Sequence, residues 1–197
     1  MWMSGFDFYF TFYGLILGLS VAQVASGFAN ALNLRKRSRL GFLTPLLSLF
    51  VLLDITTFWL YAWALRDQVT VTYGLMFGGL VVTITYYLAA SLIFPRERDE
   101  WASLDEHYWS QKRLVIAGIL AANLVVFGFT MFKAPPAWTD WIYWAWWITY
   151  YLPLAVLLIS KDRRIDAVLL SWLLICFVVA GLNLLPASQW NAAAGLS

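Results

Sequence analysis

Long runs of apolar residues fill most of the chain, and short charged segments separate them. A membrane-spanning helix needs about 20 apolar residues, because the hydrocarbon core is roughly 30 Å thick and each helical residue rises about 1.5 Å. The runs are continuous rather than alternating, unlike the strands of a transmembrane β-barrel. We therefore expect an all-α, polytopic transmembrane bundle that forms one domain over residues 1–197. The windows predict six helices, at about 6–33, 41–65, 69–94, 113–133, 138–160 and 164–186.

Basic residues gather in alternate connections between these helices. Only Arg66 and Lys133 fall on one side of the predicted bundle, against eleven lysines and arginines on the other. Lysine and arginine are concentrated in cytoplasmic loops of membrane proteins. We predict three hairpins that turn on basic cytoplasmic loops in a bacterial inner membrane, with both termini periplasmic. The eleven residues are Arg35, Lys36, Arg37, Arg39, Arg96, Arg98, Lys112, Arg113, Lys161, Arg163 and Arg164.

The composition supports a membrane protein and removes several kinds of site. Hydrophobic residues make up 62% of the chain and charged residues 12%, about half the charged share of a soluble domain. One cysteine and one histidine allow no intrachain disulfide and no multi-histidine metal site. No metal and no cofactor is therefore expected, apart from a bound lipid or flat hydrophobic ligand. No segment is basic enough to predict nucleic-acid binding.

Small residues recur at every fourth position in two predicted helices. This spacing lets helix backbones approach closely within a membrane. We expect packing within the chain to use most of these positions, with self-association through the first helix as the alternative. The predicted packing residues are Gly14, Gly18, Ala22 and Ser26 in the first helix, and Gly74 and Gly78 in the third.

Asp54 is the one acid deep inside a predicted span. Placing a charge at the bilayer centre costs about 2.5–3.5 kcal/mol, and no lysine or arginine lies inside any predicted span to pair with it. Either the carboxyl group is neutral and hydrogen-bonded, or it is charged and faces water or a bound cation. Polar residues predicted at a similar depth complete a candidate midplane site for a proton or an ion: Gln23, Thr83, Thr85, Asn123 and Tyr150.

Tryptophan is concentrated in the predicted periplasmic half, which holds nine of the 12 residues. Aromatic belts occur at both membrane interfaces, so a belt alone does not explain the imbalance. Trp138, Trp141 and Trp144 recur every three residues along the fifth helix, and Trp147 continues the series. This side is either a thick belt or a docking face for a lipid, a flat hydrophobic ligand or another membrane protein.

The connection at 95–112 is the longest polar segment. Ser103 and Glu106 have the spacing of a capping box, which predicts a short helix on the membrane surface. Its acids beside His107 lack the spacing of a zinc site, so a solvated surface is the better interpretation.

Several short motifs resemble a loose group of small, uncharacterised six-helix bacterial inner-membrane proteins. They cover the first four helices, and the resemblance implies the fold and the membrane but no activity. The motifs are Gly14-Leu-Ile-Leu-Gly18-Leu, Leu34-Arg-Lys-Arg, Phe58-Trp59, Leu92-Ile-Phe-Pro95, and Tyr108 with Lys112-Arg113.

Three classes of function remain open at this point. A non-enzymatic accessory or binding subunit of a membrane complex fits the short loops, the absence of a nucleophile motif and the uneven aromatic surface. The alternative is an ion or proton channel, or a small transporter, that uses Asp54 at the midplane. An intramembrane enzyme is the least favoured, because no catalytic motif is present. The expected partners are the lipid bilayer and either a membrane protein or a second copy of the chain.

Overall fold

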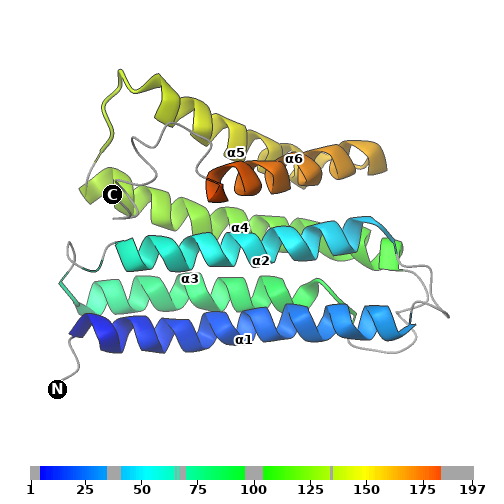
Figure 1. Cartoon of the computed structure of the whole chain (residues 1–197), viewed down its shortest axis with the longest axis horizontal. Coiled ribbons are helices and arrows are strands. Elements are labelled where there is room, and N and C mark those ends of the chain that lie inside the picture. Colours follow the sequence, from blue (N-terminus) through cyan, green and yellow to red (C-terminus); the bar gives the residue numbers. More distant parts are fainter. Residues whose placement is uncertain are drawn as a thin grey trace.

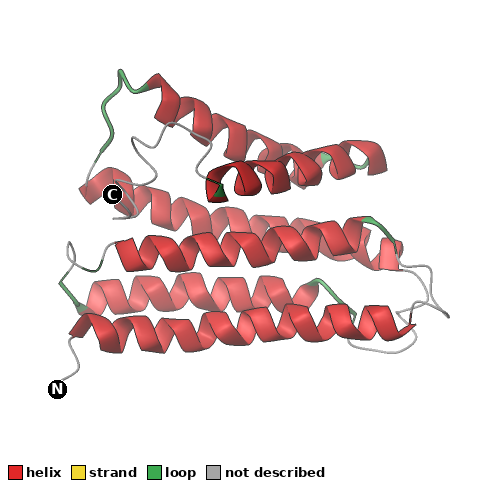
Figure 2. Ribbon diagram, in the orientation of Figure 1, coloured by secondary structure: helices red, strands yellow, loops and turns green. Residues whose placement is uncertain are grey.

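A computed structural model describes residues 5–34, 41–64, 66, 70–95, 104–133 and 135–182. These residues form helices and short connections, with no strand among them (Figure 2). The helices are α1 (Gly5–Leu34), α2 (Leu43–Ala64), α3 (Tyr73–Leu92), α4 (Leu104–Lys133), α5 (Trp141–Ile159) and α6 (Arg163–Gly181). All six are long and apolar enough to cross a membrane, as a multi-pass integral membrane protein requires. The prediction of an all-α chain with six such helices is confirmed.

Side-chain caps explain where three of these helices begin. Thr72 accepts a hydrogen bond from the backbone of Leu75 at the start of α3, and Asp140 accepts one from Tyr143 at the start of α5. Asp162 does the same for α6. Each cap satisfies backbone N–H groups that have no partner within the first turn.

The helices lie roughly along one long axis, with α5 and α6 on one side of the other four (Figure 1). α1 packs most extensively against α3, and α3 packs equally closely against α4. α2 contacts α4 within the group of four helices, and it also contacts α6 of the other pair, so it links the two groups. α1 is also in closer contact with α3 than with α2, so helices that are not consecutive in the sequence are neighbours in the bundle. The grouping into three hairpins and the periplasmic position of both termini remain predictions.

The start of α4 differs from the predicted one. α4 begins at Leu104, so the predicted short surface helix is the first part of a 30-residue helix. Leu104 and Tyr108 are buried, which anchors these turns in the bundle rather than on a membrane surface. Because these turns contain polar and charged residues, the sequence pattern predicted a start for this span, at 113, that is too late. Ser103, the first residue of the predicted capping box, lies outside the described residues.

Glycines do bring helices together, although mostly not the predicted ones. A Cβ atom on Gly27 would overlap the ring of Phe94, and one on Gly79 would lie 2.8 Å from Cζ of Tyr13. Among the predicted positions, Gly14 is close to Trp59, at 3.2 Å from its ring. Gly18 and Gly78 have no such neighbour within 4 Å, Gly74 meets only Thr72 of its own cap, and Ala22 and Ser26 are exposed. Spacing identified helices that pack closely, but apart from Gly14 it did not identify the residues in contact.

Candidate functional site

Asp54 is the centre of a polar cluster inside the bundle. Its side chain is 2% exposed. Tyr150 donates a hydrogen bond to Oδ1 at 2.5 Å, and Tyr86 donates one to Oδ2 at 2.8 Å. The side-chain amide of Asn123 also donates to Oδ2, at 3.0 Å. Both carboxylate oxygens therefore have donors from the protein itself.

Four helices supply this cluster: α2 carries Asp54, α3 Tyr86, α4 Asn123 and α5 Tyr150. Aromatic side chains enclose it, with Phe58 5.7 Å from the Tyr86 ring and Phe50 6.5 Å from the Tyr150 ring, between centroids. Burial in an apolar environment makes every missing hydrogen bond costly. The arrangement therefore ties four helices to one carboxyl group.

The remaining predicted members of the midplane site do not reach Asp54. Thr83 donates to the carbonyl of Gly79 and Thr85 to that of Val81, so both hydroxyls bond within α3. Gln23 lies on α1 and lines a separate recess between α1 and α3. Of the residues predicted from depth, Asn123 and Tyr150 reach Asp54, whereas Thr83 and Thr85 bond within α3 and Gln23 lies nearer the end of that helix.

Tyr86 is the member of the cluster that sequence reasoning missed. Tyrosines are common in membrane helices, where most are explained by interfacial belts. Tyr86 lies near the middle of its span, however, and well inside the bundle at 1% exposure. A tyrosine far from both ends of a span was the signal available in the sequence.

The predicted aromatic face of α5 divides into an outer and an inner part. Trp138, just before the helix, is 87% exposed and Trp141 is 74% exposed. Trp144 stacks on Trp138 with ring centroids 5.4 Å apart, while Trp147 packs against Phe127 of α4. The buried residues of α5 begin only at Pro153. The described bundle therefore leaves Trp138 and Trp141 uncovered, whereas Trp144 and Trp147 are half-buried.

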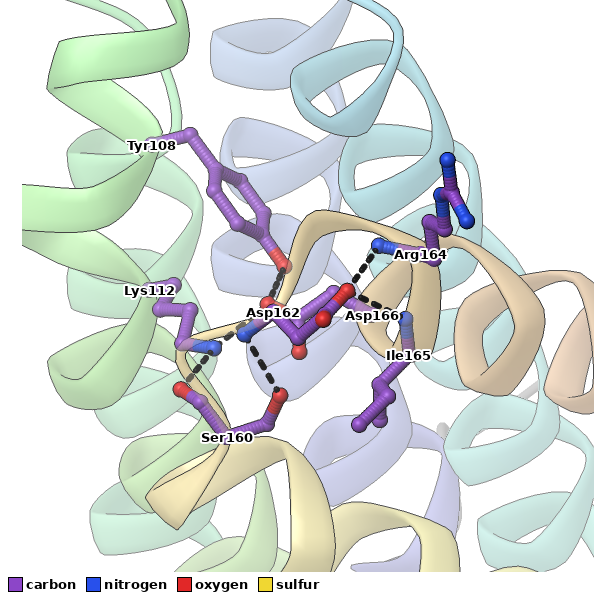
Figure 3. A network of polar contacts seen from close by, with 7 residues as sticks. All are labelled: Tyr108, Lys112, Ser160, Asp162, Arg164, Ile165 and Asp166. Atoms are coloured by element: carbon purple, nitrogen blue, oxygen red, sulfur yellow. Dashed lines mark hydrogen bonds and ion pairs between the residues drawn. The ribbon is translucent and has the colours of Figure 1, made fainter.

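A second polar cluster, shown in Figure 3, holds the first turn of α6 against α4. Lys112 of α4 forms an ion pair with Asp166 of α6 and donates to the carbonyl of Ser160 at 2.7 Å. Tyr108 donates to the same Asp166 oxygen at 2.8 Å. Lys112 is 1% exposed and Asp166 is fully buried. Two charges with this degree of burial are retained only because they are paired.

This ion pair corrects the prediction that no lysine lies inside a span. Lys112 belongs to α4 because that helix starts earlier than predicted, but its partner is Asp166 and not Asp54. The two polar clusters are therefore separate.

The described residues contain no group of three or more histidine, cysteine, aspartate or glutamate side chains arranged to hold a metal ion. His107 lies with Nε2 3.0 Å from the carbonyl oxygen of Leu92. The acids Glu97, Asp99 and Glu100, which precede it in the sequence, lie outside the described residues.

Comparison of the chain with protein-family models, curated proteins and solved structures found no significant match.

Proposed function

We propose that this chain is a non-enzymatic, multi-pass membrane protein that serves as an accessory or binding subunit. In this proposal the outer aromatic face of α5, formed by Trp138 and Trp141, contacts another membrane protein or a flat hydrophobic ligand. A membrane-protein partner is favoured over a ligand, because large exposed aromatic rings are the typical anchors of protein interfaces.

One observation carries the proposal: Trp138 and Trp141, just before and at the start of α5, are 87% and 74% exposed, whereas the later rings Trp147 and Tyr150 pack against the described bundle. The polar groups that otherwise suggest chemistry are engaged within the chain. Asp54 has three donors, and Lys112 is paired with Asp166. The surface of α5 is thus the better candidate for an external contact.

Affinity purification from native membranes tests this proposal. The intact chain should retain a second membrane protein at a fixed stoichiometry, and W138A/W141A should lose most of it. Tyr73→Ala is the matched control, because Tyr73 is an aromatic residue that is 84% exposed at the start of α3. Purification of the wild-type chain alone, or equal loss with the control, would overturn the proposal.

An ion or proton pathway through Asp54 is the second candidate, supported by an acid near the middle of α2. Its close enclosure by Tyr86, Tyr150 and Asn123 favours a structural role instead. Flux across liposomes that contain the protein distinguishes the two. A pathway requires wild-type flux above that of empty liposomes, and it requires Asp54→Asn to change that flux.

The proposed location is the bacterial inner membrane, with both termini in the periplasm. Its support is the unequal distribution of lysine and arginine along the chain. Arg35–Arg39, Arg96 and Arg98 lie outside the described residues, so this orientation remains a proposal. A reporter fused at Ser197 tests it, since activity of a cytoplasm-specific reporter would contradict the assignment.

A further inference from the structure

A recess of about 260 Å³ lies between α1 and the end of α3, away from the aromatic face of α5. Polar side chains line its α1 side, and the opposite wall is formed by Ala90 and Ser91 of α3 and by Phe94 just after that helix. Gln23, Ser26 and Asn30 follow one another at helical spacing on α1. A polar recess on the outside of a membrane helix is unusual, because lipid tails offer no hydrogen bonds.

The three polar side chains of α1 are available to a ligand. Within the described residues, Gln23, Ser26 and Asn30 have no hydrogen-bond partner, and Ser26 and Asn30 are exposed. Ser91 on the opposite wall instead donates to the carbonyl of Leu88 in its own helix. The recess therefore offers two amide groups and one hydroxyl, which are neutral donors as well as acceptors.

The register of α1 against α3 gives the depth of the recess. Both helices run in the same direction, since Gly5 lies beside Val71 and Gly27 beside Phe94. α3 has 20 residues and is about 30 Å long, which matches the hydrocarbon core. α1 has 30 residues and is about 45 Å long, so it extends past the end of α3. Residues 23–30 lie at the level of that end, where a bilayer changes from acyl chains to ester and phosphate groups.

Apolar surface continues from the recess toward the bilayer centre. Leu19, one turn before Gln23, is 53% exposed, and Leu88, one turn before Ser91, is 55% exposed. An occupant with a polar group at the membrane boundary and a hydrocarbon chain below it matches both surfaces. A phospholipid has this division at this depth.

We propose that the recess binds one phospholipid of the surrounding membrane. Gln23, Ser26 and Asn30 donate hydrogen bonds to its phosphate and ester oxygens, and its acyl chains lie against Leu19 and Leu88. Neutral donors bind these oxygens without requiring a particular headgroup charge. The site is separate from the aromatic face of α5 and does not depend on the function proposed for that face.

Native mass spectrometry of the purified full chain in detergent tests the site, with palmitoyl-oleoyl phosphatidylglycerol or phosphatidylethanolamine added. The wild-type chain should retain one phospholipid per chain. Q23L/N30L should bind it about tenfold more weakly, as expected for the loss of two or more neutral hydrogen bonds. Ser26→Phe fills the recess at an exposed position and should block binding without removing the amides.

Thr56→Val is the matched control, because Thr56 is an exposed polar residue on α2 that bonds only to its own helix. It should bind phospholipid as the wild type does. A wild-type chain that retains no phospholipid overturns the proposal whatever the variants do. Unchanged binding by folded Q23L/N30L and Ser26→Phe also overturns it. A wild-type dimer that those variants dissociate would assign the recess to a second copy of the chain instead.

Discussion

At the scale of single residues, Asp54 connects more of the bundle than any other polar group in the described chain. Its carboxyl group receives hydrogen bonds from α3, α4 and α5 while it belongs to α2. Interhelical hydrogen bonds within membranes contribute about 0.6 kcal/mol each on average. A donor left buried without an acceptor costs more, about 1–3 kcal/mol. The cluster is therefore a substantial part of the stability of the bundle.

Replacing Asp54 with alanine should lower the free energy of unfolding by about 2–4 kcal/mol, because three donors lose their acceptor. Asp54→Asn should cost less, since the amide oxygen still accepts. Reversible unfolding in mixed detergent micelles measures both. Thr56→Ala, on the same helix and exposed, is the control, and a loss no larger than that of this control would contradict the role assigned to Asp54.

The ion pair between Lys112 and Asp166 makes a different prediction. Removing one member strands a buried charge, so Lys112→Met alone should cost about 3–5 kcal/mol of stability. Removing both charges, in K112M/D166L, should cost less than Lys112→Met. The same unfolding measurement yields the coupling between the two sites. Strictly additive losses would show that the two charges do not depend on each other.

Residue types and depth along a span predicted part of the candidate site. A lone acid in an apolar run identified Asp54, and equal depth identified Asn123 and Tyr150. Depth does not give the rotation of a helix, so Thr83 and Thr85 were expected at the same site but bond within α3. Gln23 was also expected there, but it lies nearer the end of α3, beside Ala90 and Ser91. The pairing of Lys112 with Asp166 was not predicted, because it depends on where α4 starts and how α6 packs.

At the scale of elements, the close approach of α1 and α3 depends on two glycines. Gly79 faces the buried ring of Tyr13, whose hydroxyl donates to the carbonyl of Met76, and Gly27 faces Phe94. Spacing every fourth residue suggested other positions, since a sequence pattern cannot identify which side of a helix faces its neighbour. The presence of six spans was predicted because each needs about 20 apolar residues, whereas the start of α4 was not, because its first turns carry polar residues.

Gly79→Ala and Gly78→Ala form a matched pair that tests this contact. A methyl group on Gly79 would lie 2.8 Å from Cζ of Tyr13, so overpacking should cost about 1–3 kcal/mol. The methyl group on Gly78 has no neighbour within 4 Å and should leave stability unchanged or slightly raised. Thermal unfolding in detergent compares the two variants. Equal effects would contradict the assigned face of α3.

At the scale of the whole molecule, buried side chains join the described helices into one bundle, and one side of it carries exposed aromatic rings. α1 to α4 surround buried side chains along most of their length. The ion pair between Lys112 and Asp166 connects α6 to α4. The fully buried residues of α5 begin at Pro153, and its aromatic beginning diverges from α4 (Figure 1). The exposed aromatic beginning of α5 is the observation on which the proposed binding role rests.

Photo-crosslinking in native membranes tests the binding proposal most directly. A photoreactive amino acid replaces Trp138 or Trp141 in one set of variants, and Tyr73 or Phe77 of α3, which are also exposed, in the control set. We predict a discrete adduct with a second membrane protein from the α5 positions and none from the α3 positions. No adduct at Trp138 and Trp141, or the same adducts at all four positions, would contradict the proposal that the aromatic face of α5 binds a partner.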